Sequence, residues 1–201
     1  DLDIRGAGNL LGAEQSGFIT DMGFETYQKI LAEAMEELGV ETGIVTKSST
    51  DSFVSDCTIE TDHLALIPDS YIDLTAEKIR IYKELDSLTS EKELEQMKVR
   101  LTDRFGKMPL ELERLFDIVR IRQLGKKIGF EKIIIKNGVL IAFFITNPLS
   151  QYYRSERFSK VLQKVSEHPK LFEVKQPDGR LRIVVRNVDS IAKALQIMKM
   201  L

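Results

Sequence analysis

A glycine-rich stretch near the start of the chain, DLDIRGAGNLLGAEQSGF, contains the residue types found in phosphate-binding loops. Arg5 lies beside three closely spaced glycines, Gly6, Gly8 and Gly12. A dinucleotide-binding loop needs G-x-G-x-x-G between a strand and a helix, whereas these glycines are spaced G-x-G-x-x-x-G. A further turn, EQSG, follows, and the chain has no G-K-[ST] motif. The spacing argues against a nucleotide loop and favours tight backbone turns, for which glycine is suited.

Two long polar side chains in this stretch, Arg5 and Gln15, are not explained by turn formation. Both are long polar side chains beside a backbone constrained by glycines. From the residues alone, both could be ordinary surface residues.

The remaining candidates for chemistry are few. Cys57 is the single cysteine, so it forms no disulfide within the chain, which fits a reducing cytoplasm. Only two histidines, His63 and His168, accompany it, and they are far apart in sequence. We therefore expect no metal site, and we expect Cys57 to be a small buried hydrophobic residue.

Composition indicates a globular chain with an uneven charge. Of its 201 residues, 43% are hydrophobic and 30% charged, and no apolar run is long enough to span a bilayer. The net charge is −7 over residues 1–55 and +7 over residues 130–201. The chain begins with an aspartate, has no recognisable leader and reaches its glycine loop within a few residues. We therefore expect a piece of a larger cytoplasmic protein, with an acidic and a basic part that meet different partners.

The sequence predicts three segments with an α+β fold. Residues 1–38 contain the glycine loop and an amphipathic helix, and residues 39–55, rich in Ser, Thr and Asp, form a linker. Residues 56–201 form a domain of helices packed on a small, largely antiparallel sheet. The helices expected in this domain are 75–88, 90–106, 109–127, 155–167 and 189–201. Strand pairs are expected around Asn137-Gly138 and around the turn at 177–179.

A basic ridge is predicted on the helix near residue 160. Its members, at helical spacing on one side, are Arg154, Arg157, Lys160 and Lys164. The ridge could bind DNA, dock on an acidic protein surface, or be the solvated face of a core helix. Nucleic acid is disfavoured because few aromatic residues are interspersed with the basic ones.

Two stretches in order resemble one known family. The segment DLDIRGAGNLLGAEQSG followed by GFETYQKILAEA resembles the translocation motif of bacterial transcription-repair coupling factors, a motif also found in the fork-reversing helicase RecG, which usually has proline where this chain has Ala7. The segment PDSYIDLTAEKIRIYKELDSLTSEKELEQMKVRLTDRFGKMP resembles the C-terminal domain of the coupling factors, which RecG lacks.

This resemblance implies a function for each segment. Arg5 and Gln15 fall on the arginine and glutamine of the translocation motif, which are implied to convert nucleotide-driven closure of a motor into movement on double-stranded DNA. Residues 56–201 are implied to be a regulatory domain that docks on an N-terminal module similar to UvrB, and thereby hides the surface that binds UvrA and restrains the motor. The whole protein is implied to be an ATP-dependent DNA translocase that acts on stalled RNA polymerase. The 201-residue chain alone is expected to be a catalytically silent monomer without cofactor, because ATP and magnesium bind to the motor domains outside it.

Overall fold

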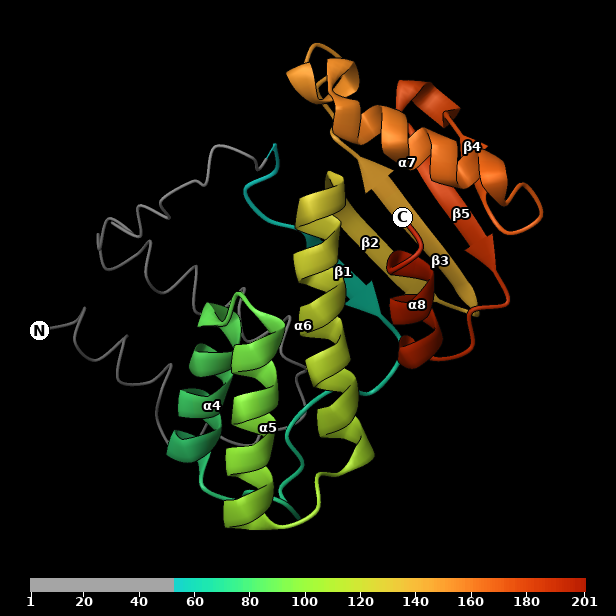
Figure 1. Ribbon diagram of the computed structural model, residues 1–201. Helices are drawn as coiled ribbons and strands as arrows, with labels where there is room; N and C mark the ends of the chain where they lie inside the picture. Colours follow the sequence, from blue (N-terminus) through green and yellow to red (C-terminus); the bar gives the residue numbers. More distant parts are fainter. Residues whose placement is uncertain (1–52) are drawn as a thin grey trace, which may run out of the picture. The chain divides into compact units, whose positions relative to one another are not determined.

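The computed structural model describes residues 53–201, which divide into two compact units (Figure 1). The helical unit comprises Leu64–Leu115, and the sheet unit comprises residues 53–63 with Phe116–Leu201. Helix α6, Leu110–Ile128, begins in the helical unit and ends in the sheet unit. The segment 1–38 and nearly all of the linker lie outside the described residues, so the predicted domain boundaries remain predictions.

In the helical unit, helices α4 (Thr75–Ser87) and α5 (Glu91–Phe105) form where the sequence predicts them. At the start of α5 the Ser90 side chain accepts a hydrogen bond from the Glu93 N–H, and the Glu93 carboxylate accepts one from the Ser90 N–H at 3.0 Å. Each group satisfies a backbone donor that the first helical turn leaves free. Leu85 of α4 and Leu94 of α5 are fully buried, as the amphipathic spacing requires.

Two tyrosines attach the segment before α4 to the helices of this unit. The Ile67 N–H donates to the buried Tyr82 Oη at 2.9 Å. The Tyr71 hydroxyl lies 3.0 Å from the Leu101 carbonyl oxygen and 2.9 Å from that of Gly106, so it shares its proton between two acceptors at the end of α5. These bonds give the irregular segment a defined course.

The sheet unit is built on five strands in the order β1-β2-β3-β5-β4. Their bounds are β1 Thr58–Thr61, β2 Phe130–Lys136, β3 Val139–Phe144, β4 Glu173–Lys175 and β5 Arg182–Arg186. Strand β1 pairs with β2 in parallel, and the other three pairings are antiparallel. The prediction of an α+β fold with a largely antiparallel sheet is confirmed.

The two strand connections differ in length. Asn137 and Gly138 have φ of 54° and 72°, so both adopt the left-handed conformation that a two-residue hairpin turn requires. The second connection is longer, because the β4–β5 pairing ends at Lys175 and Arg182, and a short 3-10 helix, η3 (Pro177–Gly179), lies between them. The prediction of a tight second turn at 177–179 therefore identified the position but not the length of the loop.

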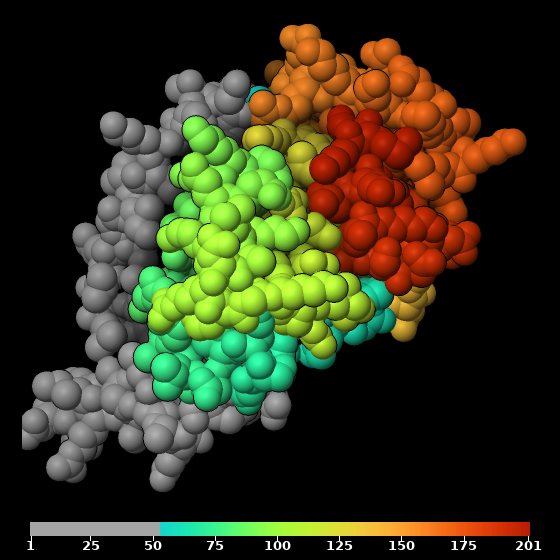
Figure 2. Space-filling view, turned by 60° about the horizontal axis from the view of Figure 1, so that its bottom comes forward, coloured from blue at the N-terminus to red at the C-terminus, as the bar shows by residue number. Residues whose placement is uncertain are grey.

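Helices cover one face of the sheet. Helix α7 spans Glu156–Glu167 and α8 spans Ile191–Met198, and Figures 1 and 2 show them side by side, with the end of α6 on the same face in Figure 1. Helix α8 begins later than predicted because the Ser190 side chain accepts from the Lys193 N–H at 3.1 Å and caps the helix there, and it also ends earlier, at Met198. The core between helices and sheet includes Ile133, Ala142 and Ile183.

Candidate functional site

The position of the predicted ridge is determined by one buried tyrosine, Tyr152. It lies in a 3-10 helix, η2 (Gln151–Arg154), and its hydroxyl donates to the Ile128 carbonyl oxygen at 2.6 Å, at the end of α6. Burial raises the pKa of Tyr152 above its usual range, so this donor keeps its proton at neutral pH. The ring packs against Gly129, where no Cβ occupies the space. Tyr152 thus connects the start of α7 to the end of α6.

Aromatic rings surround this anchor and hold the start of α7 in place. The ring of Tyr152 lies 5.3 Å from that of Phe158 on α7 and 6.2 Å from that of Phe144 on β3, measured between ring centres. Phe53 approaches Tyr152 edge-on at 5.5 Å. Edge-on and tilted arrangements of this kind are favourable for aromatic pairs beyond the area that they bury. The cluster therefore determines where α7 leaves the sheet.

Helix α7 presents its basic residues outward because of its cap and its apolar stripe. The Ser155 hydroxyl oxygen accepts from the Phe158 N–H at 3.3 Å, which fixes the start of the helix. Val161 and Val165 are buried against the rest of the unit. Lys160 and Lys164 lie on the exposed side, with 69% and 51% of their side chains accessible.

The structure modifies the predicted ridge in two ways. Arg154 is exposed but belongs to η2, so the assumption that it continues the α-helical spacing of the other three residues is wrong, because Ser155 interrupts the helix there. Lys160 pairs with Glu156 at 2.8 Å and Lys164 with Glu167 at 3.7 Å. These pairs reduce the field of the ridge. They are exposed, however, and exposed pairs are weak enough to be exchanged for carboxylates of a partner.

A hollow of about 520 Å³ opens beside the ridge, between α6 and the start of α7. Its lining includes Phe53, Lys127, Glu156, Arg157 and Lys160. The Arg157 guanidinium carbon lies 5.8 Å from the centre of the Phe53 ring, and the hydrogen bond from Lys160 lowers the pKa of Glu156. The hollow therefore has three basic side chains against one carboxylate, a combination suited to an acidic group.

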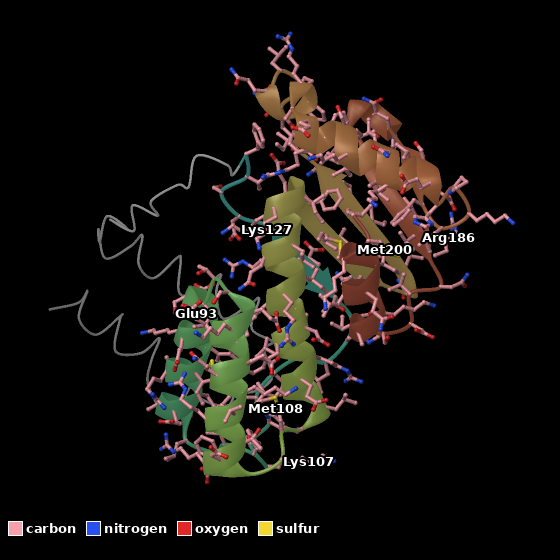
Figure 3. The ribbon with its side chains drawn as sticks, viewed as in Figure 1. Glu93, Lys107, Met108, Lys127, Arg186 and Met200 are labelled. Carbon is pink, nitrogen blue, oxygen red and sulfur yellow. The ribbon has the colours of Figure 1, made fainter. Side chains whose placement is uncertain are left out.

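Lys127 is a member of this site that the sequence analysis did not single out. It lies in the last turn of α6, and Figure 3 labels it near the end of that helix. A basic residue in a last helical turn is common, because it offsets the negative end of the helix dipole, so its type was not a distinctive signal. Lys127 lies 30 residues before Arg157 in the sequence, and the two residues line the same hollow because Tyr152 joins the start of α7 to the end of α6.

Other candidate residues give no site among the described residues. Cys57 is 1% exposed, and burial, with the nearby charge of Asp56, raises its pKa to about 12, so the thiol is unreactive at neutral pH. Residues 53–201 contain no group of three His, Cys, Asp or Glu side chains that could hold a metal ion. In the same part of the chain no helix has both the length and the apolar character needed to cross a membrane. The motif residues Arg5, Gln15, Gly6, Gly8 and Gly12 lie outside the described residues.

A family model assigns this fold. Residues 61–155, from the end of β1 to the cap of α7, match the TRCF domain. A crystal structure of the C-terminal domain of a transcription-repair coupling factor is similar in fold, with a TM-score of 0.60 at 18% identity over 72% of this chain and 88% of that one. The chain therefore carries a TRCF domain.

Whole-chain relatives extend the assignment. The transcription-repair-coupling factor of Rickettsia typhi is 33% identical over 98% of this chain, so the match extends into residues 1–52. Those of Escherichia coli and Bacillus subtilis are each 38% identical over 66% of the chain. The chain belongs to the transcription-repair-coupling factor family. It spans 17% of the length of the Rickettsia typhi protein and 11% of the other two.

Proposed function

We propose that this chain is the C-terminal regulatory part of an ATP-dependent double-stranded DNA translocase that displaces stalled RNA polymerase and recruits nucleotide-excision repair in the bacterial cytoplasm. The match of residues 61–155 to the TRCF domain is the observation that carries the proposal. The names of the relatives support an activity in transcription-coupled repair. In this proposal ATP and magnesium bind to motor domains outside the chain, and residues 56–201 act by docking.

The docking partner that we propose is the N-terminal UvrB-like module of the same protein, whose contact with residues 56–201 hides the UvrA-binding surface. The ridge and its hollow support this idea because Arg157, Lys160 and Lys127 offer cations to an acidic surface. Weak docking suffices. Each 1.4 kcal/mol is a factor of ten, so about 3 kcal/mol keeps a competing site covered about 99% of the time.

Deletion of residues 56–201 from the whole protein tests this proposal. Deletion should increase UvrA binding and the ATPase rate measured without polymerase, because the cover is removed. Unchanged UvrA affinity and unchanged ATPase would exclude a lid. Charge reversal of Arg157, Lys160 and Lys127, the basic residues that line the hollow, should reproduce the deletion if the hollow is the contact. Reversal of Lys83, Lys92 and Lys107, three exposed lysines of the helical unit, is the matched control.

Replacement of Arg5 or Gln15 tests the motor assignment separately. In the whole protein, alanine at either position should leave ATP hydrolysis largely intact and abolish displacement of a DNA triplex. The reason is that both residues belong to the proposed coupling loop and not to the nucleotide site. Wild-type displacement in both variants would show that the resemblance to the translocation motif does not extend to these side chains.

Two other functions are distinguishable by binding measurements on the isolated chain. A stand-alone enzyme with a cofactor loop at Gly6–Gly12 would bind nucleotide, whereas we expect neither binding nor hydrolysis of ATP. A stand-alone nucleic-acid module would bind duplex DNA with a steep salt dependence.

A further inference from the structure

The sheet has a second face that the helices of its own unit leave open. Strand residues alternate between the two faces, and the register aligns Ile59, Ile133, Ala142 and Ile183 in one row, all four of them buried. Figure 1 shows α7, α8 and the end of α6 on one face of the sheet. The sequence neighbours of those four residues point to the opposite, outer face. Within the sheet unit no described helix packs against that outer face.

Three rows of side chains cross the outer face, perpendicular to the strands. The middle row is apolar in its centre and has a carboxylate at each end, in the order Glu60, Ile134, Ile141, Val184 and Glu173. The rows on either side are basic. One contains Lys132, Phe143, Arg182 and Lys175, and the other contains Lys136, Val139 and Arg186. Figure 3 labels Arg186 at the end of β5.

The two carboxylates neutralise only part of this charge. Glu60 pairs with Lys132 at 2.8 Å and with Lys136 at 3.5 Å. Glu173 pairs with Arg186 at 2.9 Å and with Lys175 at 3.2 Å. Hydrogen bonds from these bases lower the pKa of both carboxyl groups, so both remain charged at neutral pH. Five basic side chains against two carboxylates leave an excess of three positive charges on the outward-facing strand residues. Just outside the strands, Arg180 adds one base and Asp62, which interacts with Lys136, adds one carboxylate, so the excess remains three.

Arg180 and Arg182 are the basic residues of this face without a carboxylate. Their guanidinium carbons lie 4.6 Å and 4.8 Å from the centre of the Phe143 ring. The Nε atoms of both are buried and have no hydrogen-bond partner in the described part of the chain. Buried donors are normally satisfied, and six other arginines of the described part have an aspartate or glutamate partner. No described carboxylate therefore offsets the charges of Arg180 and Arg182, and the carboxylates of a partner could do so.

We propose that the outer face of the sheet binds an acidic amphipathic helix of a separate protein. Ile134 and Ile141, which are partly exposed in the middle row, would receive the apolar stripe of that helix, next to Val184, which is 6% exposed. Glutamates or aspartates on either side of the stripe would meet the two basic rows. Five strands at about 4.8 Å span about 19 Å, which corresponds to about 13 residues of helix at 1.5 Å each.

Nucleic acid fits this face less well than an acidic helix does. The aromatic residue of the face, Phe143, is 8% exposed beneath the two arginines, so it offers no free ring on which a base could stack. Phosphates would satisfy the basic rows but would give the apolar row no apolar partner. The ridge on α7 lies on the other side of the sheet, so occupation of the outer face is compatible with docking through the ridge. The proposal stands on the sheet alone and does not depend on the proposed function.

Fluorescence anisotropy with a designed peptide tests the proposal. The probe is a labelled 16-residue helix with a leucine stripe flanked by glutamates, and the comparison probes are a scrambled peptide of the same composition and a 20-base-pair duplex. We expect the 201-residue chain to bind the amphipathic peptide at least tenfold more tightly than the scrambled one. Arg180→Glu with Arg182→Glu should weaken this binding at least tenfold. Lys92→Glu with Lys107→Glu, an equal charge change on exposed residues of the helical unit, should leave it unchanged.

The milder pair Arg180→Gln with Arg182→Gln keeps the test valid if charge reversal disturbs folding, and circular dichroism monitors the fold of each variant. The proposal is supported if peptide binding is lost in the Arg180 and Arg182 variants and is retained in the Lys92 and Lys107 control. Equal affinity for the scrambled peptide, unchanged binding in these variants, or no peptide binding at all would overturn it. Tighter binding of the duplex than of the peptide would also overturn it, in favour of nucleic acid.

Discussion

Replacing Gly129 by alanine should destabilise the sheet unit strongly, because two separate costs meet at this residue. Gly129 has a φ of +109°, which L side chains rarely adopt, and holding another residue there costs roughly 1–3 kcal/mol. A Cβ atom would also lie 2.3 Å from one ring carbon of Tyr152 and 2.7 Å from its hydroxyl oxygen. Overpacking of this kind costs about 1–3 kcal/mol. The expected loss in the free energy of unfolding is therefore roughly 2–6 kcal/mol.

Urea unfolding of the 201-residue chain, followed by circular dichroism, measures this loss, and Gly138→Ala is the matched control. Gly138 also has a positive φ, +72°, but no atom lies within 4 Å of the position that its Cβ would take. The control should therefore show the backbone cost alone, about 1–2 kcal/mol. The difference between the two variants contains the contact with Tyr152 together with the difference in backbone cost between the two φ values.

A double-mutant cycle identifies the obstacle. If the Tyr152 ring causes the extra cost, Gly129→Ala should be less destabilising in a Tyr152→Leu background than in the wild type. Equal losses for the Gly129 and Gly138 variants, or no coupling between Gly129 and Tyr152, would refute the idea that the tyrosine anchors α7 through a space that only glycine leaves open.

Three further predictions concern other parts of the chain. Burial raises the pKa of Cys57 from 9.0 to about 12, so the contribution of this thiol to the free energy of unfolding is complete below pH 9 and decreases between pH 9 and 12, by up to about 1.4 kcal/mol per pH unit. The same dependence of the free energy of unfolding on alkaline pH in Cys57→Ala would contradict this. Ser90→Ala should cost about 1 kcal/mol in urea unfolding by removing the cap of α5, and an unchanged unfolding midpoint would count against the capping box. Tyr71→Phe should also cost about 1 kcal/mol, not twice that, because one proton serves both the Leu101 and the Gly106 carbonyl groups; thermal denaturation measures it, and a doubled loss would show two independent bonds.

Features determined by neighbouring residues could be predicted from the sequence. Ser90 and Glu93 lie three residues apart, which is the spacing of a capping box, and they cap the same helical turn. Asn137-Gly138 forms its hairpin turn because both residues tolerate a positive φ, whatever surrounds them. In both cases the interacting groups are three residues or fewer apart, so the chain itself brings them together.

Features that depend on distant residues could not be predicted in the same way. The parallel pairing of β1 with β2 joins Thr58 to Lys132 across the whole helical unit, and no local pattern records it. Likewise, the placement of Lys127 beside Arg157 depends on the bond from Tyr152 to Ile128, and the unsatisfied Nε atoms of Arg180 and Arg182 depend on strand register. Charge counts suggested that the C-terminal part is basic, but only the fold divides those charges between the two sides of the sheet.

The pairing of β1 with β2 also has a consequence for synthesis of the chain. Strand β1 lies at an edge of the sheet with β2 as its single strand neighbour in the described residues, and Thr58 is translated 74 residues before its partner Lys132. At about 5–20 residues per second, β1 is synthesised roughly 4–15 seconds before β2. The intervening helical unit can fold from local contacts during that interval, whereas β1 cannot. A nascent chain halted between these two strands would therefore hold a folded helical unit beside an unpaired strand, the state in which we expect a chaperone to be most useful.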